Sequence, residues 1–303
     1  MDKEMELEIT GGKLHVRIRD GEAVVTSCRV MEGKVKIPDE VEGVLVTAIE
    51  RKVFLSCRQL KEITLPSGLR QIGDWAFAYC GNLTHVWLPG QAISFGKGVF
   101  KDCHALAGIF TCPDDPNCQE EERQVGILLG TVPVKLETEY LLVPEEAGSK
   151  QWIWRYDVKL REFLAQPDED GYTKMVYCGE EDIMANMDLY LAERRREKSR
   201  LCYLRLLNPT GLEEEFAREL MDYLKDHTKG CISEAAWEVV YQEHGNEQDY
   251  YETFLRSGCV TEENYDAILS EMGESYPEMK GYLMRYRLEQ MGGSDFFDLL
   301  SLD

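Results

Sequence analysis

Three segments of this chain repeat one another at a fixed spacing of 23 residues: VTAIERKVFLSCRQLKEITLPSG from Val46, LRQIGDWAFAYCGNLTHVWLPGQ from Leu69 and AISFGKGVFKDCHALAGIFTCPD from Ala92. The copies share five apolar columns, namely Ile49, Ile72 and Phe95; Phe54, Phe77 and Phe100; Cys57, Cys80 and Cys103; Leu60, Leu83 and Leu106; and Ile63, Val86 and Ile109. A fixed period of about 20 to 29 residues is typical of a solenoid, whose stacked rungs bury a common core. The sequence therefore predicts three stacked rungs over residues 46–114.

The shared pattern Ile-x4-Phe-x2-Cys-x2-Leu-x2-Ile-x-Leu-Pro resembles the leucine-rich repeat family in its BspA-like form. The resemblance covers roughly residues 8–114, and GKVKIPDEVEGVLVTAI (33–49) matches the longer first repeat of that family through Val35, Ile37 and Pro38. It implies a β-solenoid and a bacterial protein, and for many exported relatives adhesion to surfaces. The start MDKEMELEIT has no apolar run of a signal peptide, so we do not carry the adhesive role over and expect a cytoplasmic protein.

One face of the predicted solenoid carries aromatic side chains. Pro89 lacks an N–H and ends the strand that begins at His85. Strand alternation points Val86 inward and turns His85 and Trp87 outward. Thr64 and Phe110 share the column of Trp87. We predict a partner-binding face made of Thr64, His85, Trp87 and Phe110, with packing by another part of the same chain as the alternative.

The ten cysteines include no CxxC pair. Cys57, Cys80 and Cys103 occupy a column that points into the core, so we interpret them as small buried apolar side chains. The loop TCPDDPNC ends the last repeat and contains Cys112 and Cys118. A disulfide, a shared metal ion or free thiols fit this spacing, and we favour free thiols.

A second repeat lies near the C-terminus, with an offset of 28 residues between Cys231 and Cys259. Its copies read as a helix, a glycine turn at Gly245 or Gly273, and a second helix. A degenerate earlier copy precedes them, so we predict three stacked hairpins of an α-solenoid. The fold class is α+β, with a leucine-rich repeat domain at 1–118, a junction at 119–185 and a helical repeat domain at 186–303.

Composition narrows the partners and the chemistry. The chain has 34 basic and 56 acidic residues and a formal charge of −22, which disfavours nucleic acid and anionic membranes. Its one basic run, ERRREKSR at 193–200, is interpreted as a solvated helix face. The sequence has no phosphate-binding loop, nucleophile elbow or zinc-protease motif, and we expect no cofactor, metal site or membrane span.

Two functions remain. The first is a non-catalytic protein–protein interaction scaffold, and SDFFDLLSLD at 294–303 is then a cap on the last hairpin or a partner motif. The second is a hydrolase or small-ligand-binding protein, with a site at the domain junction around Trp152, Trp154, Tyr156 and the acidic turn QPDEDG. We favour the scaffold, because two repeat types occur together without a catalytic motif.

Overall fold

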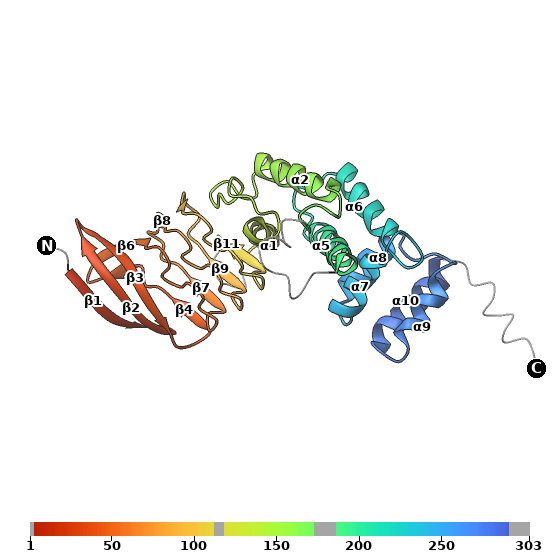
Figure 1. Cartoon of the computed structure of the whole chain (residues 1–303), viewed down its shortest axis with the longest axis horizontal. Coiled ribbons are helices and arrows are strands. Elements are labelled where there is room, and N and C mark those ends of the chain that lie inside the picture. The colour runs from red at the N-terminus through yellow and green to blue at the C-terminus, as the bar shows by residue number, and fades with distance from the viewer. Residues whose placement is uncertain (1–2, 112–117, 173–185, 291–303) are drawn as a thin grey trace, which may run out of the picture. The chain divides into compact units, whose positions relative to one another are not determined.

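The computed structural model describes residues 3–111, 118–172 and 186–290. The chain divides into two compact units, residues 1–160 and residues 161–303, and each is described by itself. The first unit is a β-solenoid followed by helices, and the second is built from helices (Figure 1). The predicted α+β class and the order of its two parts are confirmed.

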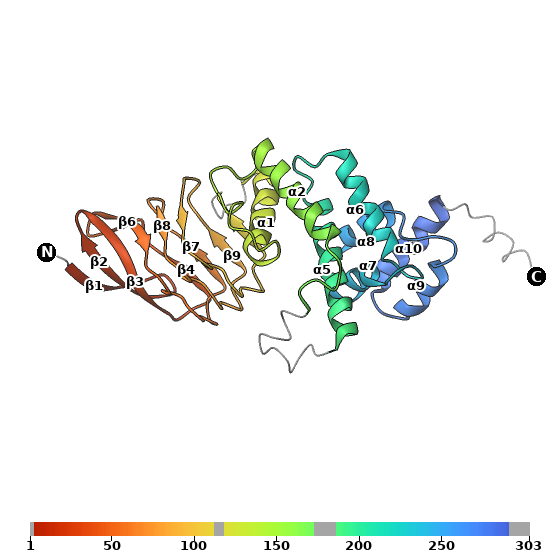
Figure 2. The same cartoon turned by 45° about the horizontal axis from the view of Figure 1, so that its top comes forward.

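Each rung of the solenoid contributes one strand to each of two sheets (Figure 2). One sheet is parallel and consists of β4 (Lys34–Lys36), β7 (Glu62–Thr64), β9 (His85–Trp87) and β11 (Gly108–Phe110). The other contains β6 (Val44–Ile49), β8 (Gln71–Ile72) and β10 (Ser94–Phe95), with β5 (Glu40–Val41) paired to β6. An antiparallel meander of β1 (Lys3–Ile9), β2 (Gly12–Arg19) and β3 (Glu22–Val30) extends this second sheet and precedes the rungs.

The repeated columns form the core of the solenoid. The rings of Phe54, Phe77 and Phe100 stack on one another, with centroids 4.9 and 5.4 Å apart. Cys80 and Cys103 are fully buried, and each thiol donates to a carbonyl oxygen of the preceding rung at 3.0 Å. A cysteine suits this column because it is narrow and its S–H group reaches that carbonyl. Cys57, in the first rung, is only half-buried.

Helix α1 (Glu120–Val134) packs on the last strand of the solenoid. Two glycines allow this close approach, since a Cβ at Gly130 would lie 2.7 Å from Cα of Gly108 and a Cβ at Gly126 would lie 2.2 Å from the Phe110 ring. Helix α2 (Lys150–Ala165) follows. Cys118, just before α1, is disulfide-bonded, which corrects the prediction of free thiols.

The described residues of the second unit form three helical hairpins, as the C-terminal repeat predicted. They are α5 (Met187–Leu207) with α6 (Glu214–Asp226); α7 (Ala235–Glu238) and the π-helix η1 (Val239–Glu243) with α8 (Gln248–Arg256); and α9 (Tyr265–Met272) with α10 (Pro277–Gln290). Their core includes Trp237, Phe254 and Cys259, all fully buried. The segment 294–303 lies outside the described residues.

Candidate partner-binding surface

The outward side of the parallel sheet carries the four residues that strand alternation selected. In β9 the central Val86 is fully buried, whereas His85 and Trp87 on either side are half-buried. The parallel register places Thr64, Trp87 and Phe110 in one row across three strands. His85 lies in the neighbouring row, beside Glu62. We call Thr64, His85, Trp87 and Phe110 the aromatic patch.

The three rings of the aromatic patch contact one another. The centroids of His85 and Trp87 are 5.7 Å apart, those of His85 and Phe110 5.7 Å, and those of Trp87 and Phe110 5.8 Å. Phe110 reaches His85 because its ring lies over Gly108, where a Cβ would come within 2.4 Å of the ring. Offset aromatic pairs at such distances attract one another by about 0.5–1.5 kcal/mol each, so the patch is preorganised.

Polar neighbours fix the orientation of the patch. Nδ1 of His85 is 3.0 Å from the hydroxyl of Thr84, and that hydroxyl donates to the carbonyl of Lys61 at 2.9 Å. The rows continue across β4, where Lys34 forms an ion pair with Glu62 at 2.7 Å. The face is therefore aromatic at the end of the last rungs and charged toward β4.

One edge of the aromatic patch is covered by the same chain. Gly126 of α1 lies directly against the Phe110 ring, where there is no room for a Cβ atom. The other patch members are half-buried and not fully enclosed. The alternative of packing by the same chain therefore applies to Phe110.

The aromatic residues of α2 do not form an open ligand stack. Trp152 and Tyr156 are fully buried, and their polar atoms are used: the Trp152 indole donates to the carbonyl of Leu141 at 2.9 Å, and the Tyr156 hydroxyl pairs with Thr131 at 2.9 Å. Trp154 is 62% exposed. Across 3–111, 118–172 and 186–290, no three His, Cys, Asp or Glu side chains are grouped to hold a metal ion.

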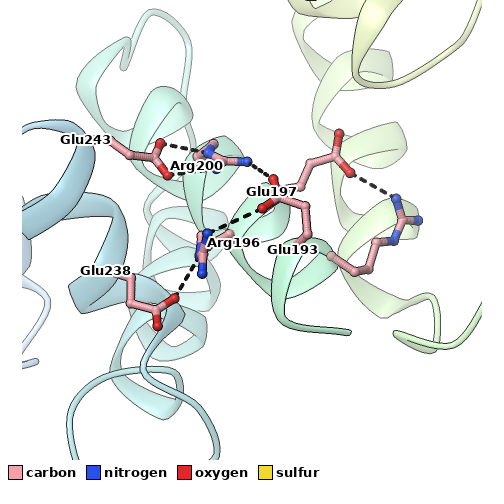
Figure 3. Close-up of polar contacts among 7 residues, drawn as sticks. Glu193, Arg196, Glu197, Arg200, Glu238 and Glu243 are labelled. Carbon is pink, nitrogen blue, oxygen red and sulfur yellow. Dashed lines mark hydrogen bonds and ion pairs between the residues drawn. The ribbon is translucent and has the colours of Figure 1, made fainter. Parts of the chain in front are cut away.

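The basic run at 193–200 is part of an ion-pair network, not a solvated helix face. Figure 3 shows Arg200 bonded to Glu193 and Glu243, and Arg196 bonded to Glu238. The Arg200 guanidinium donates to Glu193 at 2.6 Å and to Glu243 at 2.7 Å, and Arg196 donates to Glu238 at 2.8 Å. These glutamates raise the pKa of Arg200 further above its ordinary value. No local pattern in the sequence indicates these ion pairs, because the partners on α7 and η1 lie about 40 residues away along the chain.

A second part of the network reaches the acidic turn. The side chain of Lys198 is 3% exposed, and its ammonium donates to Asp168 at 2.7 Å and to the carbonyl of Gln166 at 2.5 Å. Arg195 binds the other oxygen of Asp168 at 2.8 Å. The basic charges are thus neutralised within the second unit, and they do not form a free phosphate-binding stripe.

Residues 31–118 match the family described as BspA type leucine rich repeat region, with six copies. The first unit carries a BspA type leucine-rich repeat region. This confirms the resemblance stated from the repeat columns. Among the curated proteins, none is similar to the chain.

Solved bacterial leucine-rich repeat proteins are similar over about a third of the chain. A leucine-rich repeat protein of T. pallidum is 27% identical over 35% of this chain and 49% of its own, with a TM-score of 0.31. One from Bacteroides capillosus is 27% identical over 37% and 88%, with a TM-score of 0.31. A leucine rich cell surface protein of Faecalibacterium prausnitzii is 22% identical over 36% and 31%, also with a TM-score of 0.31. The chain thus spans about half of the T. pallidum protein.

Each helix in the described parts of the chain is too short or too polar to cross a lipid bilayer. The cytoplasmic location expected from the sequence stays a prediction.

Proposed function

We propose that the chain is a non-catalytic protein-interaction scaffold that binds a protein partner through the aromatic patch. The observation that supports this most is the stacked set of His85, Trp87 and Phe110 on an outward sheet face. Half-buried aromatic side chains held in place by their neighbours lose little conformational freedom on binding. Trp in particular is enriched among the residues that dominate interface energies. The leucine-rich repeat region of the first unit agrees with this function.

The partner must contact more than the three rings. A specific interface buries about 800 Å² on each partner, which is more than the exposed parts of a few half-buried side chains supply. The rows of the parallel sheet lead from the rings to Thr64, Lys36 and the Lys34–Glu62 pair. We propose that this charged end forms the polar rim of the interface.

The test is a binding measurement with a matched control. The full chain captures a partner from an extract, and the purified partner is titrated by calorimetry against wild type, Trp87→Ala and Trp154→Ala. We expect Trp87→Ala to weaken binding at least about 30-fold, as for a hot spot of about 2 kcal/mol, and Trp154→Ala to change it less than about twofold.

A second variant separates loss of the binding surface from loss of the fold. Thr64→Arg keeps every ring and places a bulky charge in the row of Trp87, so it should block the same partner while circular dichroism stays unchanged. Unaltered affinity in both Trp87→Ala and Thr64→Arg, with both variants folded, would remove the aromatic patch from the interface.

A further inference from the structure

The last rung of the solenoid borders a cavity of about 410 Å³. The cavity lies on the loop side of the rung, away from β11, and belongs entirely to the first unit. Its apolar lining comes from Phe95, Val99 and Phe100 of the rung and from Pro133, Val134 and Leu142 at the end of α1 and beyond. This volume is in the range of about 300–1,000 Å³ that is typical of binding pockets.

Backbone hydrogen bonds between successive rungs show which acceptors are missing at this cavity. In the first rung the N–H groups of Lys52, Phe54 and Ser56 donate to carbonyls of the second rung at 3.0, 2.8 and 2.8 Å. In the second rung the corresponding N–H groups of Trp75, Phe77 and Tyr79 donate to carbonyls of the third rung at 2.9, 3.0 and 2.7 Å. Each rung is therefore bonded to the next through every second residue of its loop.

The third rung has the same three donors, but the described residues form no further rung to accept from them. They are the N–H groups of Gly98, Phe100 and Asp102, which all line the cavity. Within the described structure none of the three has an acceptor. Gly98 and Asp102 keep the left-handed backbone of the earlier rungs, each with a φ of 57°, so the donors retain the repeat geometry. Phe100 is only 1% exposed, and a buried N–H without a partner is rare in folded proteins.

The apolar column ends at the same place. Phe100 is the last ring of the Phe54–Phe77–Phe100 stack. Helix α1 covers the strand side of the last rung through Gly126 and Gly130. The loop of the last rung, residues 98–102, instead borders the cavity. One more rung at this place would supply three carbonyl acceptors and an apolar side chain.

We propose that this cavity binds an extended peptide segment of a protein partner, which adds a short extra rung to the solenoid. Backbone carbonyls at alternate residues of the peptide accept from Gly98, Phe100 and Asp102, and an apolar side chain between them packs toward Phe100. This is the sheet-edge mode of peptide recognition applied to the end of a solenoid.

The charges at the rim define the peptide further. The acidic side chains are Asp102, Glu137 and Glu139, and the basic ones are Lys101 and His104, of which His104 is 3.8 Å from Asp102. The rim carries three carboxylates against two basic side chains, an excess of acidic groups. A lysine or arginine beside the apolar anchor therefore complements the rim.

This inference rests on the proposed function, because it names a class of partner for the same scaffold. The probe is acetyl-GKGVFK-amide, which has the sequence of residues 96–101 of the chain and so imitates a further rung. Controls are acetyl-GEGVFE-amide, with the charges reversed, and acetyl-GKGVGK-amide, without the aromatic anchor. Each is titrated into the full chain, labelled with ¹⁵N, at near-neutral pH.

We expect a dissociation constant on the order of 1 mM or tighter, as for a short flexible ligand. Amide exchange at Gly98, Phe100 and Asp102 should slow on binding, whereas the amides of Phe54 and Phe77, which already have acceptors, should not change. Both control peptides should bind at least about fivefold more weakly. The double variant Glu137→Gln/Glu139→Gln should remove the preference for the basic peptide, and the matched variant Glu32→Gln/Glu145→Gln, which changes two exposed glutamates outside the lining, should keep it.

Two outcomes would overturn the inference: no protection of the three amides at saturating peptide, or equal binding of all three peptides. Val134→Trp, which fills the cavity from α1, should abolish binding in a chain whose melting temperature is unchanged. Trp87→Ala should leave peptide binding intact. If Trp87→Ala abolishes binding of the protein partner but the peptide does not bind in the cavity, the proposed scaffold function stands and the proposed extra rung is wrong.

Discussion

The ion pair between Lys198 and Asp168 gives the sharpest test of how the second unit is held together. We consider Asp168→Ala, which removes the carboxylate from a lysine whose side chain is 3% exposed. The ammonium keeps one neutral acceptor, the carbonyl of Gln166 at 2.5 Å. It is then a buried charge without a counter-ion.

Removing one partner of a buried pair costs about 3–5 kcal/mol, because the remaining charge stays desolvated. We therefore expect Asp168→Ala to lower the free energy of unfolding of the second unit by about 3 kcal/mol or more. Lys198→Met/Asp168→Ala removes the charge as well, and should recover most of that loss. Glu219→Ala is the control, since Glu219 pairs with Arg161 at an exposed site, where such pairs contribute about 1 kcal/mol or less.

Pulsed alkylation during a urea titration, followed by peptide mass spectrometry, reads the second unit alone. Cys202 is fully buried on α5 and burial raises the pKa of its thiol, so it reacts only when that unit opens. A cost below about 1 kcal/mol for Asp168→Ala, or a double variant no more stable than the single one, would refute the reasoning.

The same pair makes stability depend on pH. Burial raises the pKa of Asp168, but hydrogen bonds from Lys198 and Arg195 outweigh it, and the pKa in the folded chain is lowered. A lowered folded pKa stabilises the chain above the unfolded value of about 3.9 and loses that contribution as pH falls through the folded value. Protonation of Asp168 leaves Lys198 without its counter-ion, as Asp168→Ala does, so the urea midpoints of wild type and Asp168→Ala should converge as pH falls below about 4.

Three further outcomes are expected. Phe77→Ala should lower the free energy of unfolding of the first unit by about 3–5 kcal/mol, and Phe54→Ala by about 1 kcal/mol less, because Phe77 stacks on two rings and Phe54 on one; equal denaturant midpoints for the two variants would contradict this. In native protein at pH 8, iodoacetamide should modify exposed Cys231 and leave Cys80 intact, since the hydrogen bond with Cys103 and burial raise the pKa of the Cys80 thiol; mass spectrometry showing both labelled at one rate would count against it. Trp87→Phe should remove emission that acrylamide quenches, and a loss of only shielded emission would mean that the sheet face is covered.

Sequence reasoning located the elements that repeat. The columns at 23-residue spacing predicted the stacked phenylalanines and the buried Cys80, because a solenoid places equivalent residues directly over one another. Strand alternation alone placed His85 and Trp87 on the outward side. The 28-residue offset predicted helical hairpins in the second unit.

The tertiary structure decided what depends on distant residues. The basic run at 193–200 is neutralised by carboxylates that lie elsewhere in the chain, such as Asp168 and Glu243, and no local pattern shows which charges meet. The open donors of Gly98, Phe100 and Asp102 were missed for a related reason. Repeat columns show that each rung bonds to the next, but only the tertiary structure shows that, among the described residues, no further rung follows the last one. Periodicity thus determined the interior of each repeat array, and its ends and charged contacts were set by whichever segment the fold brought there.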